Sequence, residues 1–278
     1  MTSEIAETKN RESSLAGLPR REFSYFFSPE EKMFQIVVKM KDEPGALGQI
    51  LNLLRDRITL VNIHAYSNSK GEAILSGFAR HVSTAQDAAS LERVIMMAPL
   101  AIECRVMVSS DGLLVDSFHT GIETDYGERL ILFRWDAFNR MFDRMAEVFG
   151  TGGGEVMLYY EGIAIGEMYA QEMIRRFGKG TVNRNMPSII KMLSASGWGN
   201  ASLKFSEGSP IVRIGDCFES STRKRVRHGC YFMKGMITGV AKVVLGTEVR
   251  CDETKCSLRG EDCCEFTIAI DSAKSRLS

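Results

Sequence analysis

The chain has 278 residues, of which 44% are hydrophobic and 25% charged, as is usual for soluble globular proteins with room for two modest domains. Its 35 Lys and Arg residues balance 35 Asp and Glu residues, so no net charge draws it to nucleic acid or to an anionic membrane. The polar N-terminus has no signal-peptide core and the apolar runs are too short to span a bilayer, which predicts a cytoplasmic protein.

Residues 1–30 form the first predicted region, a flexible arm in which charged residues, Ser and Thr dominate and apolar periodicity is absent. Phe23, Tyr25, Phe26 and Phe27 interrupt this polar stretch. We expect these aromatic side chains to dock on the body of the protein or on a partner subunit.

A domain at residues 31–110 follows, and its apolar spacing predicts strand, helix, strand, strand, helix and strand in turn. That order is typical of a split β-α-β, ferredoxin-like sandwich. The second helix is expected to have its N-cap near Ser83 or Thr84. The predicted strands are 33–40, 58–68, 72–82 and 101–109, and the helices begin near residue 46 and span 84–99.

The peptide Asp42-Glu43-Pro44-Gly45-Ala46-Leu47 lies where the first of these helices begins. The free N–H groups of a helix start can bind a carboxylate, and glycine lets the backbone come close to a ligand. The peptide resembles the D-x-P-G-x-L signature of ACT domains, and the order of elements fits that family over residues 33–109.

This resemblance implies that paired modules bind an amino acid or similar metabolite at their interface. Asp42, Gly45, Ala46, Leu47 and Asn62 would line that site. The same peptide is also simply a good turn before a helix, and many ACT-like modules pair subunits without a ligand.

The remaining residues, 111–275, are predicted to form a second α/β domain. Residues 152–154, all glycine, are expected to break the chain between two helices. The predicted helices are 135–150, 155–178, 185–199 and 230–246, and the predicted strands are 201–208, 209–218, 247–256 and 263–270.

Five of the seven cysteines fall between Cys230 and Cys264, which in a reducing compartment indicates metal or redox chemistry. A hairpin through Gly260 would bring Cys256 and Cys264 together, and the start of the preceding helix would add Cys230. With the carboxylate of Glu253, three thiolates supply the four ligands of a closed tetrahedral zinc site. Iron or copper(I) also suits three thiolates, and an iron–sulfur cluster is a further alternative.

Residues Phe218 to Ile270 resemble the 4-vinyl reductase domain family. The resemblance rests on the residues His228-Gly-Cys230, Gly235, Gly239, Glu253-x-x-Cys256, Gly260 and Cys264-Glu-Phe266. It implies an α/β fold shared with TRAPP transport subunits and phenol-sensing regulator domains, a homodimer with an apolar ligand pocket, and zinc held by Cys230, Glu253, Cys256 and Cys264. The alternative is that reduced cysteines simply fill core space.

Several other residues also have predicted roles. Cys251 and Cys263 remain as a possible redox pair, and His228 could support the metal ligands or decorate a helix start. Tyr160 and Trp198 are expected to face the ligand pocket. The basic run 223–227 is expected to be a solvated loop, and no helix-turn-helix or zinc-finger spacing indicates DNA binding.

The sequence therefore predicts a regulatory protein that senses an amino acid, an aromatic or apolar compound, or both. A redox-responsive transcriptional regulator and an accessory enzyme of tetrapyrrole or aromatic metabolism are the alternatives. No nucleophile–base arrangement and no nicotinamide or flavin fingerprint supports an enzyme.

Overall fold

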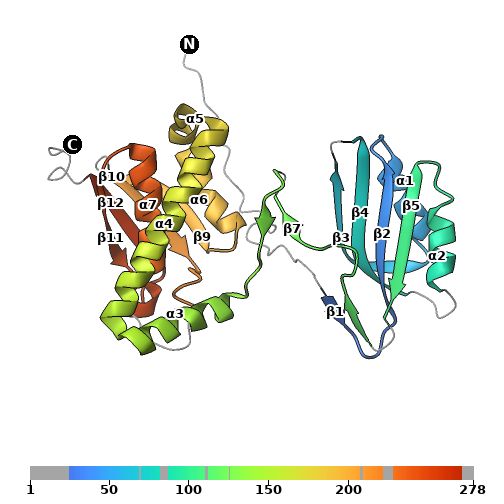
Figure 1. Cartoon of the computed structure of the whole chain (residues 1–278), viewed down its shortest axis with the longest axis horizontal. Helices are drawn as coiled ribbons and strands as arrows, with labels where there is room; N and C mark the ends of the chain where they lie inside the picture. Colours follow the sequence, from blue (N-terminus) through green and yellow to red (C-terminus); the bar gives the residue numbers. More distant parts are fainter. Residues whose placement is uncertain are drawn as a thin grey trace, which may run out of the picture. The chain divides into compact units, whose positions relative to one another are not determined.

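The computed structural model describes residues 25–68, 70–81, 87–109, 112–124, 126–206, 209–221 and 228–270. The chain divides into two units, Met1–Ile131 and Leu132–Ser278 (Figure 1). In the described ranges, no helix has the length and apolar character needed to cross a membrane. The predictions for Phe23, for an N-cap at Ser83 or Thr84 and for the basic run 223–227 concern residues outside these ranges.

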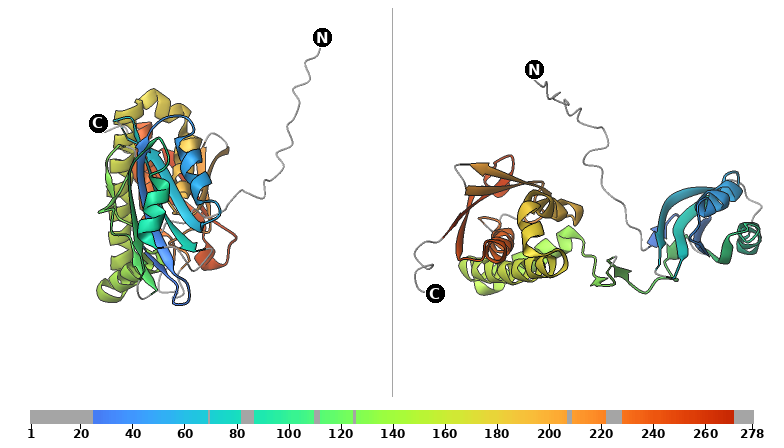
Figure 2. Two further views of the ribbon diagram at one scale, coloured as in Figure 1. Left: turned by 90° about the vertical axis from the view of Figure 1, so that its right-hand side faces the viewer. Right: turned by 90° about the horizontal axis from the view of Figure 1, so that it is seen from above.

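The first unit is built on a four-stranded antiparallel sheet with strand order β3-β4-β2-β5. Helices α1 and α2 lie together on one face of this sheet (Figure 2). The elements follow the predicted order of strand, helix, strand, strand, helix, strand. Their bounds are β2 Met33–Lys41, α1 Ala46–Leu54, β3 Ile58–Ser67, β4 Glu72–His81, α2 Ala88–Ile95 and β5 Ala101–Val108.

The core of this unit follows from the period-two pattern of β2. Phe34, Ile36 and Val38 alternate along the strand and are buried in the cluster that α1 and α2 cover. The second helix starts later than predicted, because Asp87 is its N-cap and its side chain accepts a hydrogen bond from the Ser90 N–H.

Strand β1 (Tyr25–Phe27) pairs with β6 (Leu113–Val115), so part of the predicted arm is ordered. Phe26 packs with the buried Leu114, whereas Tyr25 and Phe27 are exposed. The first unit also contains a small hairpin of β7 (Ile122–Glu123) and β8 (Arg129–Leu130), so it ends some twenty residues beyond the predicted boundary near residue 110.

The second unit combines a four-stranded antiparallel sheet, ordered β11-β12-β10-β9, with five helices among its described residues. Its strands are β9 Asn200–Ser206, β10 Ser209–Gly215, β11 Val249–Lys255 and β12 Cys264–Ile270, with a short 3-10 turn, Ser257–Arg259, before β12. Its helices are α3 Trp135–Phe149, α4 Thr151–Phe177, α5 Lys179–Arg184, α6 Met186–Ala195 and α7 Tyr231–Leu245.

Two of the predicted boundaries in this unit were wrong. The chain breaks at Gly150, which has a positive φ of 74°, and residues 152–154 already belong to α4. Residues 179–184 form the short helix α5, which was not predicted and which begins after Gly178, another glycine with positive φ.

Helix α7 is the centre of the second unit, packed between α4 and the sheet (Figure 1). Ten of its fifteen residues are buried, which explains why its sequence is apolar on nearly every face. It crosses α4 so closely that a Cβ added at Gly235 would lie 2.0 Å from the carbonyl oxygen of Tyr159. A Cβ at Gly162, on α4, would lie 2.2 Å from the carbonyl oxygen of Phe232.

Candidate metal centre

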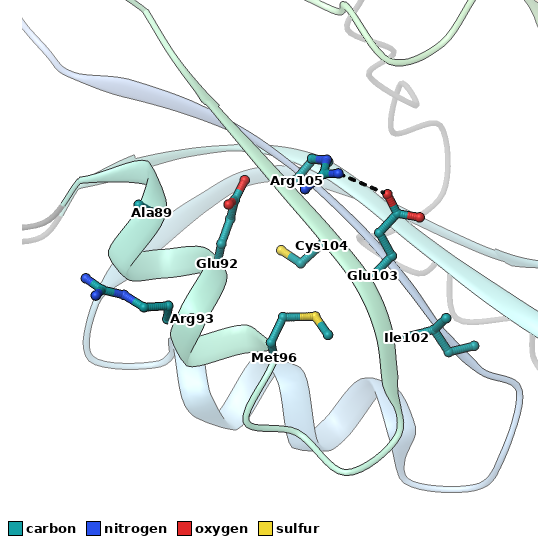
Figure 3. A pocket seen from close by; sticks show the side chains of 8 residues that line it. All are labelled: Ala89, Glu92, Arg93, Met96, Ile102, Glu103, Cys104 and Arg105. Carbon is teal, nitrogen blue, oxygen red and sulfur yellow. Dashed lines mark ion pairs between the residues drawn. The ribbon is translucent and has the colours of Figure 1, made fainter.

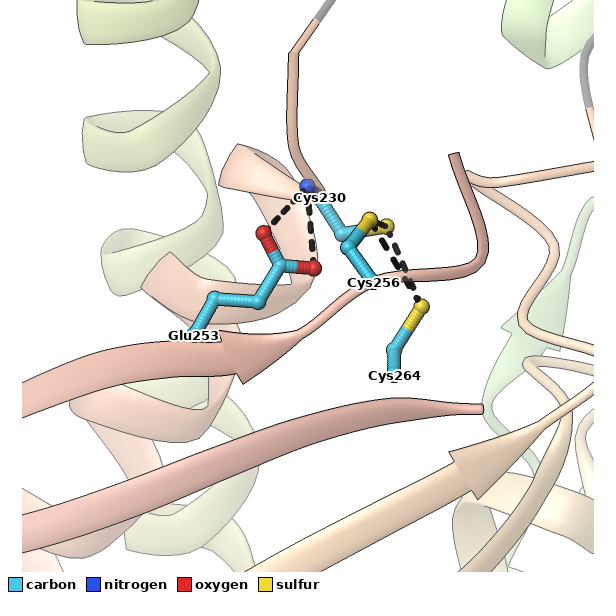
Figure 4. Close-up of side chains that lie close together, drawn as sticks. All are labelled: Cys230, Glu253, Cys256 and Cys264. Carbon is cyan, nitrogen blue, oxygen red and sulfur yellow. Dashed lines mark hydrogen bonds between the residues drawn. The ribbon is translucent and has the colours of Figure 1, made fainter. Parts of the chain in front are cut away.

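Three cysteine sulfurs gather where the start of α7 meets the β11–β12 hairpin (Figure 4). Cys230 is the N-cap of α7, Cys256 follows β11 and Cys264 opens β12. The Sγ of Cys230 lies 3.7 Å from that of Cys256 and 3.6 Å from that of Cys264, and the last two are 4.0 Å apart. All three residues are fully buried.

These separations match those of a tetrahedral zinc site. Two sulfurs bound at about 2.3 Å to one ion, at the tetrahedral angle, lie about 3.8 Å apart. A metal ion equidistant from the three sulfurs therefore fits without a large movement of the backbone. The donor set suits zinc, and its burial favours a structural role over a catalytic one.

Glu253 is the carboxylate member of the group. One oxygen of Glu253 and the three sulfurs all lie within 4.8 Å of one another. Its carboxylate accepts the backbone N–H of Cys230 at 3.1 and 3.3 Å, and it lies 3.7 Å from the Arg259 guanidinium. Burial raises the pKa of Glu253, while hydrogen bonds from the Cys256 thiol and the Cys230 N–H act in the opposite direction.

The buried thiols differ in the direction of their pKa shifts. Hydrogen bonds from Cys217, Cys230 and Cys256 lower the pKa of Cys264, so this sulfur ionises first. The same contacts, from Cys217 first and then from Cys256 and Cys264, raise the pKa of Cys230. A second negative charge in this buried cluster is therefore unfavourable without a cation, and metal binding would release protons.

Cys217 is the residue that sequence reasoning missed. It follows β10 and is fully buried in the same core as Cys230, Cys256 and Cys264. Cys217 lies outside the group whose ligand atoms are all within 4.8 Å of one another. Its place in the sequence, 13 residues before Cys230 and beyond a turn, carries no ligand spacing. The antiparallel pairing of β10 with β12 places Ile214, three residues before Cys217, opposite Cys264.

An aromatic cluster adjoins the sulfur cluster in the same core. Trp198 belongs to this cluster and stacks on Phe232 with ring centroids 5.7 Å apart. Tyr160 does not lie in it: this side chain is 65% exposed, and its described ring contact is with Tyr159. The cluster comprises Phe138, Phe142, Trp198, Phe218 and Phe232.

The proposed redox pair of Cys251 and Cys263 is contradicted by the register of the sheet. Cys251 lies opposite Ile268, five residues along from Cys263, which corresponds to about 17 Å of strand. Disulfides need Cα atoms within about 7 Å. Burial raises the pKa of Cys251 to about 12, which makes this thiol unreactive. His228 is largely exposed and lies 3.4 Å from Glu155, rather than against a sulfur.

The residues predicted to line an amino-acid site lie in the first unit. Gly45 has a φ of 89° and is the N-cap of α1, as the turn requires, while Asp42 is exposed and Ala46 is buried. Leu47 packs against the core beneath α1. Asn62 occupies a bulge in β3, where its side-chain oxygen accepts the backbone N–H of Phe78.

A surface pocket of the first unit lies elsewhere, between α2 and β5 (Figure 3). It contains none of the five predicted ligand residues. Its lining residues are Ala89, Glu92, Arg93, Met96, Ile102, Glu103, Cys104 and Arg105.

Residues 210–270 match the 4-vinyl reductase domain family, which confirms the resemblance inferred from the cysteine and glycine spacing. A curated relative is the uncharacterized protein MJ0745 of Methanocaldococcus jannaschii, 28% identical over 95 residues. The match covers 34% of this chain and 51% of that protein, so the chain spans about half the length of the relative it matches.

Three solved structures are similar at low identity. The phenol-responsive sensory domain of the transcription activator PoxR with phenol is 16% identical, with a TM-score of 0.40 over 54% of this chain and 84% of that one. Trafficking protein particle complex subunit 3 from Naegleria fowleri, covalently bound to palmitic acid, is 14% identical, with a TM-score of 0.37 over 50% and 95%. A vinyl-4-reductase family protein from Methanocaldococcus jannaschii is 15% identical, with a TM-score of 0.28 over 51% and 99%.

Proposed function

We propose that this chain is a small-molecule-responsive regulatory protein whose second unit is a binding domain stabilised by one zinc ion. The observation that carries the proposal is the set of three buried thiols at 3.6 to 4.0 Å, within the region that matches the 4-vinyl reductase domain family. Cys230, Cys256 and Cys264 would hold the ion, with the Glu253 carboxylate as the predicted fourth donor.

The role of the zinc would be to fix the start of α7 onto the hairpin. Among the described residues, thiol contacts and the bonds of the Glu253 carboxylate to the Cys230 N–H join these elements at this point, and zinc would add direct bonds between them. Zinc binding would close the loops between these segments. The metal–ligand bonds form only in the folded state, so they would add to the free energy of unfolding.

The ligand would be an aromatic or apolar molecule that enters the aromatic cluster. Phe232 lies two residues beyond Cys230, and the carboxylate of Glu219 accepts the N–H groups of both Phe232 and Met233. A ligand that displaced the Phe232 ring would therefore act on the same first turn of α7 that the zinc fixes. Such a ligand shifts the equilibrium only if it binds two states with different affinity.

The first unit would be the ACT-type module. Its element order and the sheet order β3-β4-β2-β5 support this proposal, as does the left-handed Gly45 at the start of α1. The first unit would contribute to regulation in one of two ways. It would bind an amino acid near Asp42, or it would pair two copies of the chain as a homodimer.

Metal content per chain tests the core of the proposal. Protein purified without oxygen should contain one zinc per chain, and Cys256→Ser should lose both the metal and thermal stability. Cys263→Ser is the matched control, because this neighbouring cysteine is partly exposed and lies outside the group that could hold a metal. Metal-free wild-type protein would refute the zinc site.

Ligand binding is tested by the fluorescence of Trp198, with phenol as the smallest aromatic probe. A saturable change is expected in zinc-loaded wild type, and Phe232→Ala, which removes the ring that the ligand would displace, should saturate at a lower phenol concentration. Trp198→Phe reports the background from Trp135, the other tryptophan of the chain, which is 48% exposed. A titration that stays linear in wild type argues against a phenol-sized site in this cluster.

A further inference from the structure

Strand β5 is an edge strand of the first sheet: β2 lies on one side of it, and no strand of the described chain lies on the other. The N–H of Val106 is accepted by the Glu92 carboxylate at 2.8 Å, so it points away from β2. Main-chain groups alternate in direction along an antiparallel strand, so those of Cys104 point the same way. Within the described residues, no hydrogen bond reaches the outward N–H and C=O of Cys104.

The surface pocket of the first unit lies against this edge, between α2 and residues 102–105 of β5 (Figure 3). It has a volume of about 480 Å³. Met96 and Ile102 form its apolar part and are 43% and 44% exposed. The described residues of the first unit therefore leave this stretch of β5 uncovered, and an uncovered edge strand is a template for pairing with another strand.

The charges of β5 favour a second copy of the same strand as the partner. Glu103 and Arg105 alternate with the buried Cys104 and Val106, so they lie on the face of the sheet that α1 and α2 leave open. Their side chains are 54% and 64% exposed. In an antiparallel pair of β5 strands centred on Cys104, Glu103 of each copy lies opposite Arg105 of the other. Pairs centred on Glu103 or on Arg105 place like charges opposite each other, which is destabilising.

We infer that the outer edge of β5 is an interface between two copies of this chain, whose β5 strands pair antiparallel about a two-fold axis at Cys104. The inference rests on the proposed pairing of copies through the first unit and names the surface that they use. The same patch serves both copies, so pairing through β5 stops at two chains. In the pair, Glu92 gives up the Val106 N–H to a main-chain carbonyl of the second copy, whereas in the single chain its carboxylate covers that donor.

Charge reversal tests the inference, with hydrogen exchange of residues 101–108 measured by mass spectrometry on the full-length protein. Glu103→Arg and Arg105→Glu each place like charges across the axis and should weaken the pair roughly tenfold, so the β5 amides should exchange faster than in wild type. An equimolar mixture of the two variants has opposite charges across the axis again and should return to slow exchange. Lys70→Glu, in the exposed turn between β3 and β4, is the control and should exchange as wild type does.

Equal β5 exchange in wild type and both variants would overturn the inference, because solvent or a different segment would then meet this edge. Faster exchange that mixing does not reverse would overturn it as well, since the two charges would then act within one chain, where they lie 3.6 Å apart. Sedimentation of the same samples separates this test from the proposed homodimer. A dimer that persists with unchanged β5 exchange pairs through another surface, and the metal content should be the same in every variant.

Discussion

Replacing Gly235 by alanine tests whether the close crossing of α7 over α4 stabilises the second unit. The new Cβ would lie 2.0 Å from the carbonyl oxygen of Tyr159 and 3.0 Å from the backbone nitrogen of Ile163. Both are main-chain atoms of a helix, so neither can rotate away. Ordinary contacts begin at 3.4 Å, so the two helices must separate by about 1 Å or more.

The size of the effect follows from two opposing contributions. Alanine is about 1 kcal/mol better than glycine in a helix interior. Overpacking a closely packed contact costs about 1–3 kcal/mol, or more when the backbone must move. Because the clash here involves only main-chain atoms, we expect the upper end of that range and a net loss of about 2 kcal/mol.

Urea unfolding followed by tryptophan fluorescence is the suitable assay, because both tryptophans, Trp135 and Trp198, lie in the second unit. With a denaturant slope of about 2 kcal/mol per molar, the midpoint of Gly235→Ala should fall by about 1 M. The control is Gly152→Ala in α4, where an added Cβ meets no atom within 4 Å and stability should rise slightly or stay unchanged. A Gly235→Ala midpoint equal to or above that of wild type would show that the helices do not pack as described.

Two further predictions concern the first unit. Burial by itself raises the pKa of Asp116, but hydrogen bonds from Gln35 and from two backbone N–H groups outweigh it, so the net pKa lies below the usual 3.8. The ionised Asp116 carboxylate therefore stabilises the folded state above about pH 4, and this stabilisation is lost as the pH falls through the lower folded-state pKa. Asp116→Asn should remove this part of the acid sensitivity of β6. Amide hydrogen exchange in β6 as a function of pH measures the effect. Asn62→Ala should lower the free energy of unfolding by about 1 kcal/mol, because the Phe78 N–H loses its hydrogen-bond acceptor. Hydrogen exchange at the Phe78 amide should become faster. Unchanged exchange would mean that the bulge does not depend on the Asn62 side chain.

The sequence alone determined most of the secondary structure and the centre of the candidate site. Alternating apolar residues in β2 and the apolar face of α3 predicted those elements, because burial on one face leaves a period in the sequence. The spacing of Cys230, Glu253, Cys256 and Cys264 identified the cluster, since a hairpin and a helix start place these residues in a fixed relation. Periodicity and residue spacing depend on residues that are near one another in the chain, so both can be read without knowledge of the fold.

Other features were decided only by the tertiary structure. The register of β11 against β12 separates Cys251 from Cys263. Gly150, rather than residues 152–154, ends α3, because all of these glycines can break a helix and only the packing of α4 selects one. Contacts between residues far apart in the chain depend on strand order and register, and single-sequence periodicity does not encode either one.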